Sequence, residues 1–164
     1  MSKQFWTFLA IGIAVVAVAV SVTWVGSKGS HLELTGNVLK VRSHQMNPKA
    51  TLVVVDFRVE NPSNIGFMVK NVEVQLIPAS GDPVTGMSIS RPDIENVFKY
   101  EKFLGTKYND VLTIRDKIDP HQKMDRMVGA RFETSEADFQ ARKAIRLRLE
   151  DMDGAISEIT EVRR

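Results

Sequence analysis

Few residues in this chain have a type and spacing that could do chemistry. The three histidines are His31, His44 and His121, which we expect in a linker, a loop and a turn after a proline. None has the spacing of zinc ligands, and the chain contains no cysteine that could supply a thiolate. The chain also lacks a nucleophile elbow, a phosphate-binding loop and a dinucleotide fingerprint. We therefore predict a protein that is not an enzyme, with no catalytic residue, metal site or cofactor.

Two groups of carboxylates could still act as an acid–base pair or a calcium site. Asp116 and Asp119 have no neighbouring base or nucleophile, which favours ordinary surface charges. The segment 150–154, EDMDG, has the ligand type that calcium prefers but lacks the spacing of a calcium loop. Its Asp-Gly pair is typical of a two-residue hairpin turn, and such a turn pairs Arg146 with Glu161 and Ile145 with Val162.

One segment is better suited to contact than to catalysis. Residues 98–108, FKYEKFLGTKY, interleave aromatic and basic side chains. The aromatic residues are Tyr100, Phe103 and Tyr108, and the basic ones are Lys99, Lys102 and Lys107. This mixture suits a membrane surface or a protein partner, because both bind amphipathic aromatic side chains next to cations. The alternative is that half of these aromatic residues cap the hydrophobic core.

The longest pattern in the chain is an uncharged run from Gln4 to Ser27, flanked by Lys3 and Lys28. A bilayer core about 30 Å thick needs about 20 apolar residues in a helix, so the run is long enough to span it. Trp6 and Trp24 lie near its two ends, where indoles favour the headgroup level. We predict that residues 1–27 form a transmembrane signal anchor, with the lipid bilayer as a partner.

Small residues on this run suggest a second role for it. Ala10 and Ala14, and then Ala17 and Ser21, have the spacing that lets helices approach closely in lipid. They predict contact with other membrane-protein subunits, although small residues are also common in single anchors. A signal peptide cleaved at the small-residue site Ala17-Val18-Ala19 is the main alternative. A short tail before a first anchor favours an extracytoplasmic, periplasmic domain, whereas the Lys and Arg count slightly favours the opposite orientation.

After a short linker at residues 28–31, we predict one β domain at residues 32–164. Apart from Lys3, all charged residues lie beyond residue 27, so this part has a formal charge of +1 against +2 for the whole chain. Such near-neutrality argues against a nucleic-acid partner, which needs a basic surface.

The β domain shows the alternation that is typical of strands. Thr51–Glu60 places four apolar side chains on one face and Asp56, Arg58 and Glu60 on the other. Phe67–Ile77 alternates in the same way, and Ser90-x-x-Asp93 and Ser135-x-x-Asp138 are capping boxes that begin short helices. We expect further strands at 32–42, 109–115 and 117–133. The fold class is therefore mainly β, an antiparallel immunoglobulin-like sandwich with one or two inserted helices.

The segment 53–63, VVVDFRVENPS, and the alternating strand after it resemble the core of WHy-type late-embryogenesis-abundant domains. The resemblance implies an immunoglobulin-like sandwich behind a single membrane anchor and carries no catalytic residue. We expect a non-enzymatic accessory subunit that braces a larger membrane protein complex. The alternative is a membrane-tethered binding or stress-protective module for a lipid, a peptide or a cell-envelope component.

Overall fold

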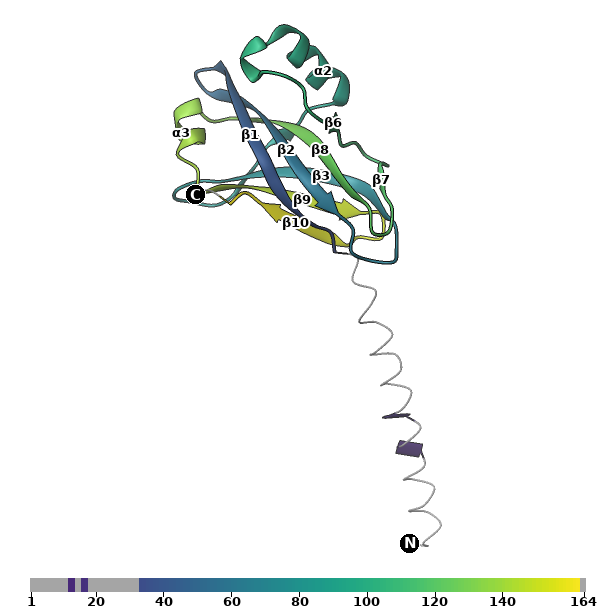
Figure 1. Ribbon diagram of the computed structural model, residues 1–164. Coiled ribbons are helices and arrows are strands. Elements are labelled where there is room, and N and C mark those ends of the chain that lie inside the picture. The colour runs from purple at the N-terminus through teal and green to yellow at the C-terminus, as the bar shows by residue number, and fades with distance from the viewer. Residues whose placement is uncertain (1–11, 14–15, 18–32, 163–164) are drawn as a thin grey trace, which may run out of the picture. The chain divides into compact units, whose positions relative to one another are not determined.

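The structure, a computed structural model, describes residues 12–13, 16–17 and 33–162 (Figure 1). The chain divides into two units, Met1–His31 and Leu32–Arg164. The four described residues of the uncharged run are helical. Among the described residues, no helix has the length and hydropathy needed to cross a bilayer. The predicted anchor positions Trp6, Ala10, Ala14, Ser21 and Trp24 lie outside the described residues.

Residues 33–162 build two facing sheets (Figure 1). The first sheet has the order β1–β2–β8–β5, and β6 also pairs with β8. Its strands are β1 (Thr35–Asn47), β2 (Ala50–Glu60), β5 (Met87–Ser88), β6 (Asp110–Val111) and β8 (Lys123–Phe132). Its pairs are antiparallel, except that β6 runs parallel to β8.

The second sheet has the order β10–β9–β3–β4, with β7 paired to the other end of β3. Its strands are β3 (Phe67–Ile77), β4 (Val84–Thr85), β7 (Lys117–Ile118), β9 (Ala144–Asp151) and β10 (Ile156–Thr160). All of these pairs are antiparallel. The prediction of a mainly β domain with antiparallel sheets and few helices is thereby confirmed.

The core lies between the two sheets and follows the predicted alternation of β2 and β3. Val53, Val55, Phe57 and Val59 are fully buried there. The second sheet contributes the apolar residues of β3 and β9, and Phe139 closes one end. Burial of this apolar area is the main favourable term in the folding of the domain.

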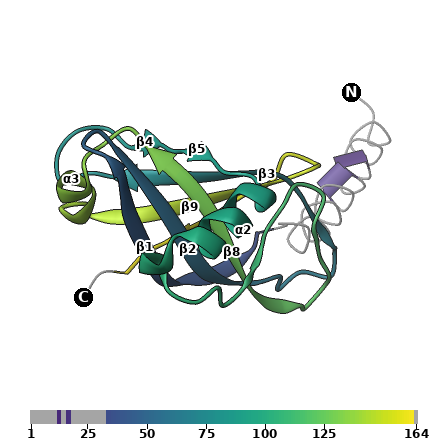
Figure 2. The same ribbon diagram turned by 90° about the horizontal axis from the view of Figure 1, so that it is seen from above.

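The outer faces of the two sheets differ, and this was not predicted. The outer face of the first sheet is buried by a second apolar cluster, in which Leu52, Val54 and Met127 contact Ile94, Leu104 and Val111. Figure 2 shows α2 (Arg91–Tyr100) lying over β2 and β8. Asp56 lies on the outer face of β2, opposite to the inner valines as predicted, but the insert covers it and it is 2% exposed.

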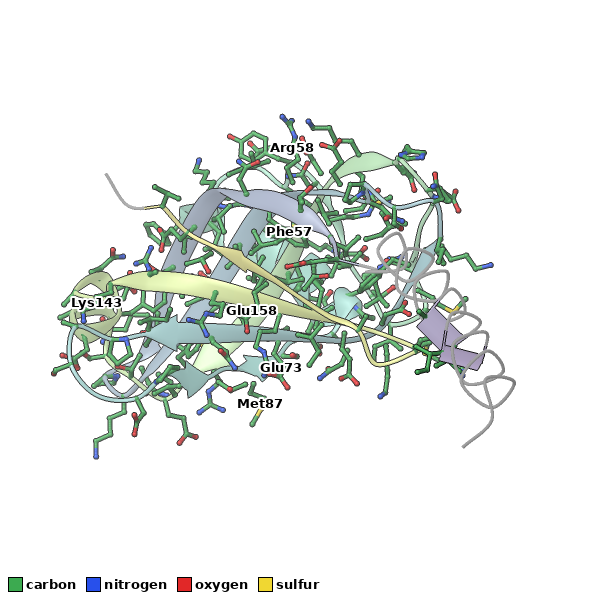
Figure 3. All side chains as sticks on the ribbon, turned by 90° about the horizontal axis from the view of Figure 1, so that it is seen from below. Phe57, Arg58, Glu73, Met87, Lys143 and Glu158 are labelled. Carbon is green, nitrogen blue, oxygen red and sulfur yellow. The ribbon has the colours of Figure 1, made fainter. Side chains whose placement is uncertain are left out.

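The outer face of the second sheet is polar instead. Arg148 of β9 forms ion pairs of 3.3 Å with Glu73 of β3 and of 3.2 Å with Glu158 of β10. Figure 3 labels the two glutamates. Charged cross-strand pairs of this kind keep a sheet face compatible with water.

Both capping boxes are confirmed. The Ser90 hydroxyl accepts the Asp93 N–H at the start of α2, and the Ser135 hydroxyl accepts the Asp138 N–H at the start of α3 (Glu136–Gln140). A short 3₁₀ turn, η1 (Lys102–Leu104), follows α2 and ends at Gly105, whose φ is 73°. The insert thus contains two short helical pieces, α2 and η1.

Several predicted strand bounds are wrong. β1 extends to Asn47, so His44 belongs to a strand and not to a loop. The strand expected at 109–115 is limited to β6, and the one expected at 117–133 is divided into β7 and β8. The division follows the turn at Pro120–His121, where His121 has a φ of 59°. Proline supplies no N–H to a ladder, so pairing stops there.

The predicted register of the last hairpin is also wrong, by one residue. Arg146 faces Thr160, because the loop between the hydrogen-bonded residues Asp151 and Ala155 has three residues and not two. The Asp151 N–H donates to Ala155 O and the Gly154 N–H donates to Asp151 O, while Gly154 has a φ of 88°. A type I turn followed by a left-handed glycine is the usual geometry of a three-residue hairpin loop.

Candidate functional site

The insert formed by α2, η1 and the segment that leads to β6 lies on the outer face of the first sheet. Ile94 is its main apolar contact and is 1% exposed. Gly129 of β8 makes room for it, since a Cβ at Gly129 would lie 2.7 Å from Ile94 Cδ1. The missing side chain thus lets the helix approach the sheet closely.

A buried arginine holds the far end of the insert. Arg42 of β1 pairs with Asp56 of β2, with Nη2 and Oδ2 2.6 Å apart. Its Nη1 donates to the carbonyl oxygens of Leu104 and Thr106, each at 2.8 Å. Its guanidinium also lies 4.8 Å from the centroid of the Phe98 ring. Two strands and the insert are therefore fixed to one another by one side chain.

A second polar contact completes this attachment. Asn109, just before β6, donates from Nδ2 to Asp56 Oδ1 at 2.9 Å. Asp56 consequently accepts from Arg42 of β1 and from Asn109, at the β6 end of the segment that follows η1. Charge-assisted bonds at buried positions are strong because few waters compete for them.

The three predicted contact aromatics lie exposed on this insert. Phe103 is 87% exposed, Tyr100 71% and Tyr108 63%. Phe103 stacks against the His44 ring of β1, with the two ring centroids 5.8 Å apart. The alternative in which half of these aromatics cap the core is therefore wrong. Together with Lys99, Lys102 and Lys107 of the same segment they form what we call the aromatic surface.

Residues of β1 extend the aromatic surface, and the sequence interpretation did not include them. Lys40 Nζ lies 5.3 Å from the centroid of the Tyr108 ring, and Arg42 lies 5.5 Å from the same ring. Lys40, Arg42 and His44 share one face of the strand because side chains alternate with a period of two. The alternation of these residues was visible in the sequence, but their proximity to the insert was not.

The lysines of the aromatic surface have acidic neighbours. Lys107 lies 3.7 Å from Glu95 and 3.6 Å from Asp110. His44 Nε2 lies 3.5 Å from a Glu101 oxygen. The surface is thus mixed in charge, and not uniformly basic.

A separate feature is a cavity of about 500 Å³ between the two sheets. Apolar walls come from Val72 and Val74 of β3 and from Val128 of β8, and Leu112 and Ile114 add to them after β6. We call this cavity the edge pocket, because it lies where the outer strands of both sheets are interrupted.

The edge pocket has a simple topological origin. After β5 the chain stops pairing with β8 at Ile89, whose N–H donates to Gly129 O. It ends its second contact with β8, through β6, at Leu112, whose N–H donates to Met127 O. Between these points the insert passes over the outer face, so the edge of β8 has no continuous neighbour. On the second sheet, β4 pairs with β3 at Gln75 and Leu76, and β7 pairs with it at Phe67 and Met68.

Arg91 supplies the one charged side chain among the residues that line the edge pocket in the described part of the chain. Its Nη2 donates to Val111 O at 2.9 Å and to Thr113 Oγ1 at 3.3 Å. An Asp116 oxygen lies 3.7 Å from the same nitrogen. The Arg91 side chain remains about half exposed, which places its charge at the rim.

The carboxylates singled out by sequence have structural contacts. Asp116 Oδ2 accepts the Thr113 N–H at 2.8 Å. Asp151 accepts the N–H groups of Met68 and Asp153, so it organises the hairpin loop and the adjacent end of β3. Among the described residues, no three histidines or carboxylates converge closely enough to hold a metal ion.

An ion pair between β2 and β8, formed by Arg58 and Asp125, changes the pKa of both partners and lies away from both surfaces. Hydrogen bonds from Arg58 lower the pKa of Asp125, and the same contact raises the pKa of Arg58. The two oxygens of Asp125 accept from Arg58 at 2.6 Å and 2.8 Å. The pair joins β2 to β8 and so stabilises the first sheet.

Comparison with known proteins gives no match to a family model, to a curated protein or to a solved structure. The similarity of residues 53–63 to WHy-type domains therefore stays a prediction from the sequence. Two features of the described residues are suited to binding a partner or a ligand, the aromatic surface and the edge pocket.

Proposed function

We propose that this protein is a non-enzymatic, single-pass membrane protein that acts as an accessory subunit of a larger membrane protein complex. The observation that carries the proposal is the aromatic surface, with Tyr100, Phe103 and Tyr108 exposed on one insert. Aromatic residues and arginine are enriched at protein interfaces because they bury a large area with few rotatable bonds. An exposed phenylalanine in this setting is typical of a residue that a partner covers.

The insert is well suited to present these residues. Three hydrogen bonds fix it to the sheet, two from Arg42 and one from Asn109 to Asp56, and Arg42 and Asp56 are themselves paired. A surface that is ordered before binding loses less conformational entropy when it binds. The buried polar contacts therefore support a permanent docking surface.

The mixed charge of the aromatic surface favours a protein over a lipid headgroup layer. Glu95, Glu101 and Asp110 each lie within 4 Å of a cationic side chain or His44. An anionic membrane attracts an excess of Lys and Arg and repels such carboxylates. A protein partner can match both signs of charge.

The uncharged run Gln4–Ser27 is the second part of the proposal. As a signal anchor it would hold an immunoglobulin-like, WHy-type domain on the extracytoplasmic side, and its small-residue positions would contact other membrane subunits. Sequence alone supports this part.

The test is purification of the tagged full-length protein from its native membrane in mild detergent. We expect a complex larger than the monomer, and we expect its recovery to fall at least tenfold in the double variant Tyr100→Ser/Phe103→Ser. Met152→Ser is the matched control, because Met152 is an exposed apolar residue in the β9–β10 loop. Recovery of the wild-type protein only as a free monomer would contradict the proposal.

The edge pocket favours a second function, a membrane-tethered binding module for an apolar ligand. A cavity of about 500 Å³ lies within the range of roughly 300–1,000 Å³ that is typical of small-molecule sites. The two functions use different residues and are separable: substitutions in the aromatic surface would leave ligand binding unchanged, and blocking the edge pocket would leave the complex intact.

A further inference from the structure

We infer that the edge pocket binds an elongated apolar ligand that carries one carboxylate, of the fatty-acid type, with the carboxylate at Arg91. This inference rests on the second function proposed above and names its ligand class. It is independent of the aromatic surface.

The apolar part of the ligand is indicated by the inner wall of the pocket. Val74, Leu112 and Val128 belong to the core cluster between the sheets, and Val72 packs against that cluster. A chain that enters here would contact the same apolar surface that the core already buries. Binding of this kind strengthens with each methylene group that is buried.

The carboxylate is indicated by the charges around the rim. The lining contains Arg91 together with the neutral polar residues Asn71, Ser88, Ser90 and Thr113, and it contains no carboxylate among the described residues. The nearest acid that faces Arg91 is Asp116, whose 3.7 Å separation is long for a charge-assisted hydrogen bond. The Arg91 contacts to Val111, Thr113 and Asp116 all use Nη2, so the N–H groups of Nε and Nη1 can donate to a ligand carboxylate.

The position of α2 adds to this preference. Ser90, Arg91 and Pro92 line the pocket and form the N-cap and the first turn of the helix. The positive end of a helix dipole stabilises an anion near it, which adds to the charge of Arg91. A ligand of equal length without a charge would gain only the apolar contacts.

The test uses the full-length protein in lipid nanodiscs and a decanoic acid that bears a photoreactive diazirine at its far end. Cross-linked peptides are mapped by mass spectrometry, and unlabelled decanoic acid or 1-decanol competes. We expect cross-links in the β domain to fall on residues 72–74, 111–114 and 128. We expect Arg91→Gln to weaken competition by decanoic acid about tenfold and to leave competition by 1-decanol unchanged, because a charge-assisted bond is lost.

Two blocking variants separate loss of the site from loss of the fold. Val72→Phe fills the pocket from β3, and Ser88→Phe covers it from an exposed position on β5. Both should remove the mapped cross-links. Val84→Phe and Arg115→Gln are the controls, because neither residue lines the pocket, and both should leave the cross-links in place.

The cross-linking and competition results test the ligand class and the site separately. Competition that is equal for acid and alcohol and insensitive to Arg91→Gln would overturn the carboxylate class while keeping an apolar site. Cross-links scattered over the domain surface, or unaffected by either blocking variant, would overturn the site itself and with it the second function. Neither result bears on the accessory-subunit proposal, which the aromatic surface carries.

Discussion

Arg42 and Asp56 form an ion pair buried on the outer face of the first sheet, with side chains only 7% and 3% exposed. The β1–β2 register places Arg42 opposite Val54, so the two charges are diagonal neighbours on adjacent strands. The pair is buried because the insert covers it and supplies the carbonyl oxygens of Leu104 and Thr106 as further acceptors. The Arg42–Asp56 pair therefore attaches the insert, with the aromatic surface that it presents, to the sandwich.

Arg42→Met should destabilise the domain by about 3 kcal/mol or more, because it leaves the buried Asp56 without its cation. Urea unfolding followed by far-ultraviolet circular dichroism measures the change. Tryptophan fluorescence would not report it, since both tryptophans, Trp6 and Trp24, belong to the predicted anchor.

The double variant Arg42→Met/Asp56→Leu should lose at least about 1 kcal/mol less unfolding free energy than the two single variants lose together. The reason is that the double variant leaves no unpaired charge buried. Hydrogen exchange should also show faster exchange across residues 89–110 in the single Arg42 variant. Additive effects, with an insert as protected as in the wild type, would mean that Arg42 does not hold it.

Gly129→Ala tests the close approach of α2 to β8. The new methyl group would meet Ile94 Cδ1 at 2.7 Å, and we expect a loss of about 1–3 kcal/mol from overpacking. Ile94→Ala alone should cost about 2–4 kcal/mol through the cavity that it leaves. The double variant should be more stable than the sum of these losses predicts, and strict additivity in urea unfolding would contradict the contact.

Ser90→Ala and Ser135→Ala remove the two N-cap acceptors. Each should lower the free energy of unfolding by about 1 kcal/mol, because an N–H at the start of a helix then loses its partner. Ser80→Ala, in the loop between β3 and β4, is the matched control and should change stability by less than about 0.5 kcal/mol. Equal losses of unfolding free energy at all three serines would show that the N-cap hydrogen bonds do not stabilise the domain.

The Arg58–Asp125 pair predicts a small pH dependence of stability. Because the pKa of Asp125 is lowered in the folded state, its contribution is present above the ordinary carboxyl pKa and is lost as the pH falls through the lower, folded value. Asp125→Asn should therefore be less stable than the wild type at pH 7, and this difference should shrink towards pH 2. A difference that stays constant between the two pH values would mean that the pair does not titrate as described.

The sequence alone determined the class of the domain and most of its local structure. Alternation in Thr51–Glu60 and Phe67–Ile77 predicted the two central strands, and the Ser90 and Ser135 boxes predicted where the helices begin. These features depend on neighbours in the chain, such as the period of the side chains and the hydrogen bonds of the first helical turn. Such short-range causes can be identified without any tertiary contact.

Tertiary structure decided what the sequence could not. The burial of Asp56, the position of Lys40 and His44 beside the aromatic surface, and the edge pocket all depend on where the insert packs. Residues 42 and 104, or 72 and 128, come together only because distant segments pair across and between sheets. The aromatic segment at residues 98–108 was identifiable as a candidate for contact, but its attachment to β1 and β2 through Arg42 is a property of the folded domain alone.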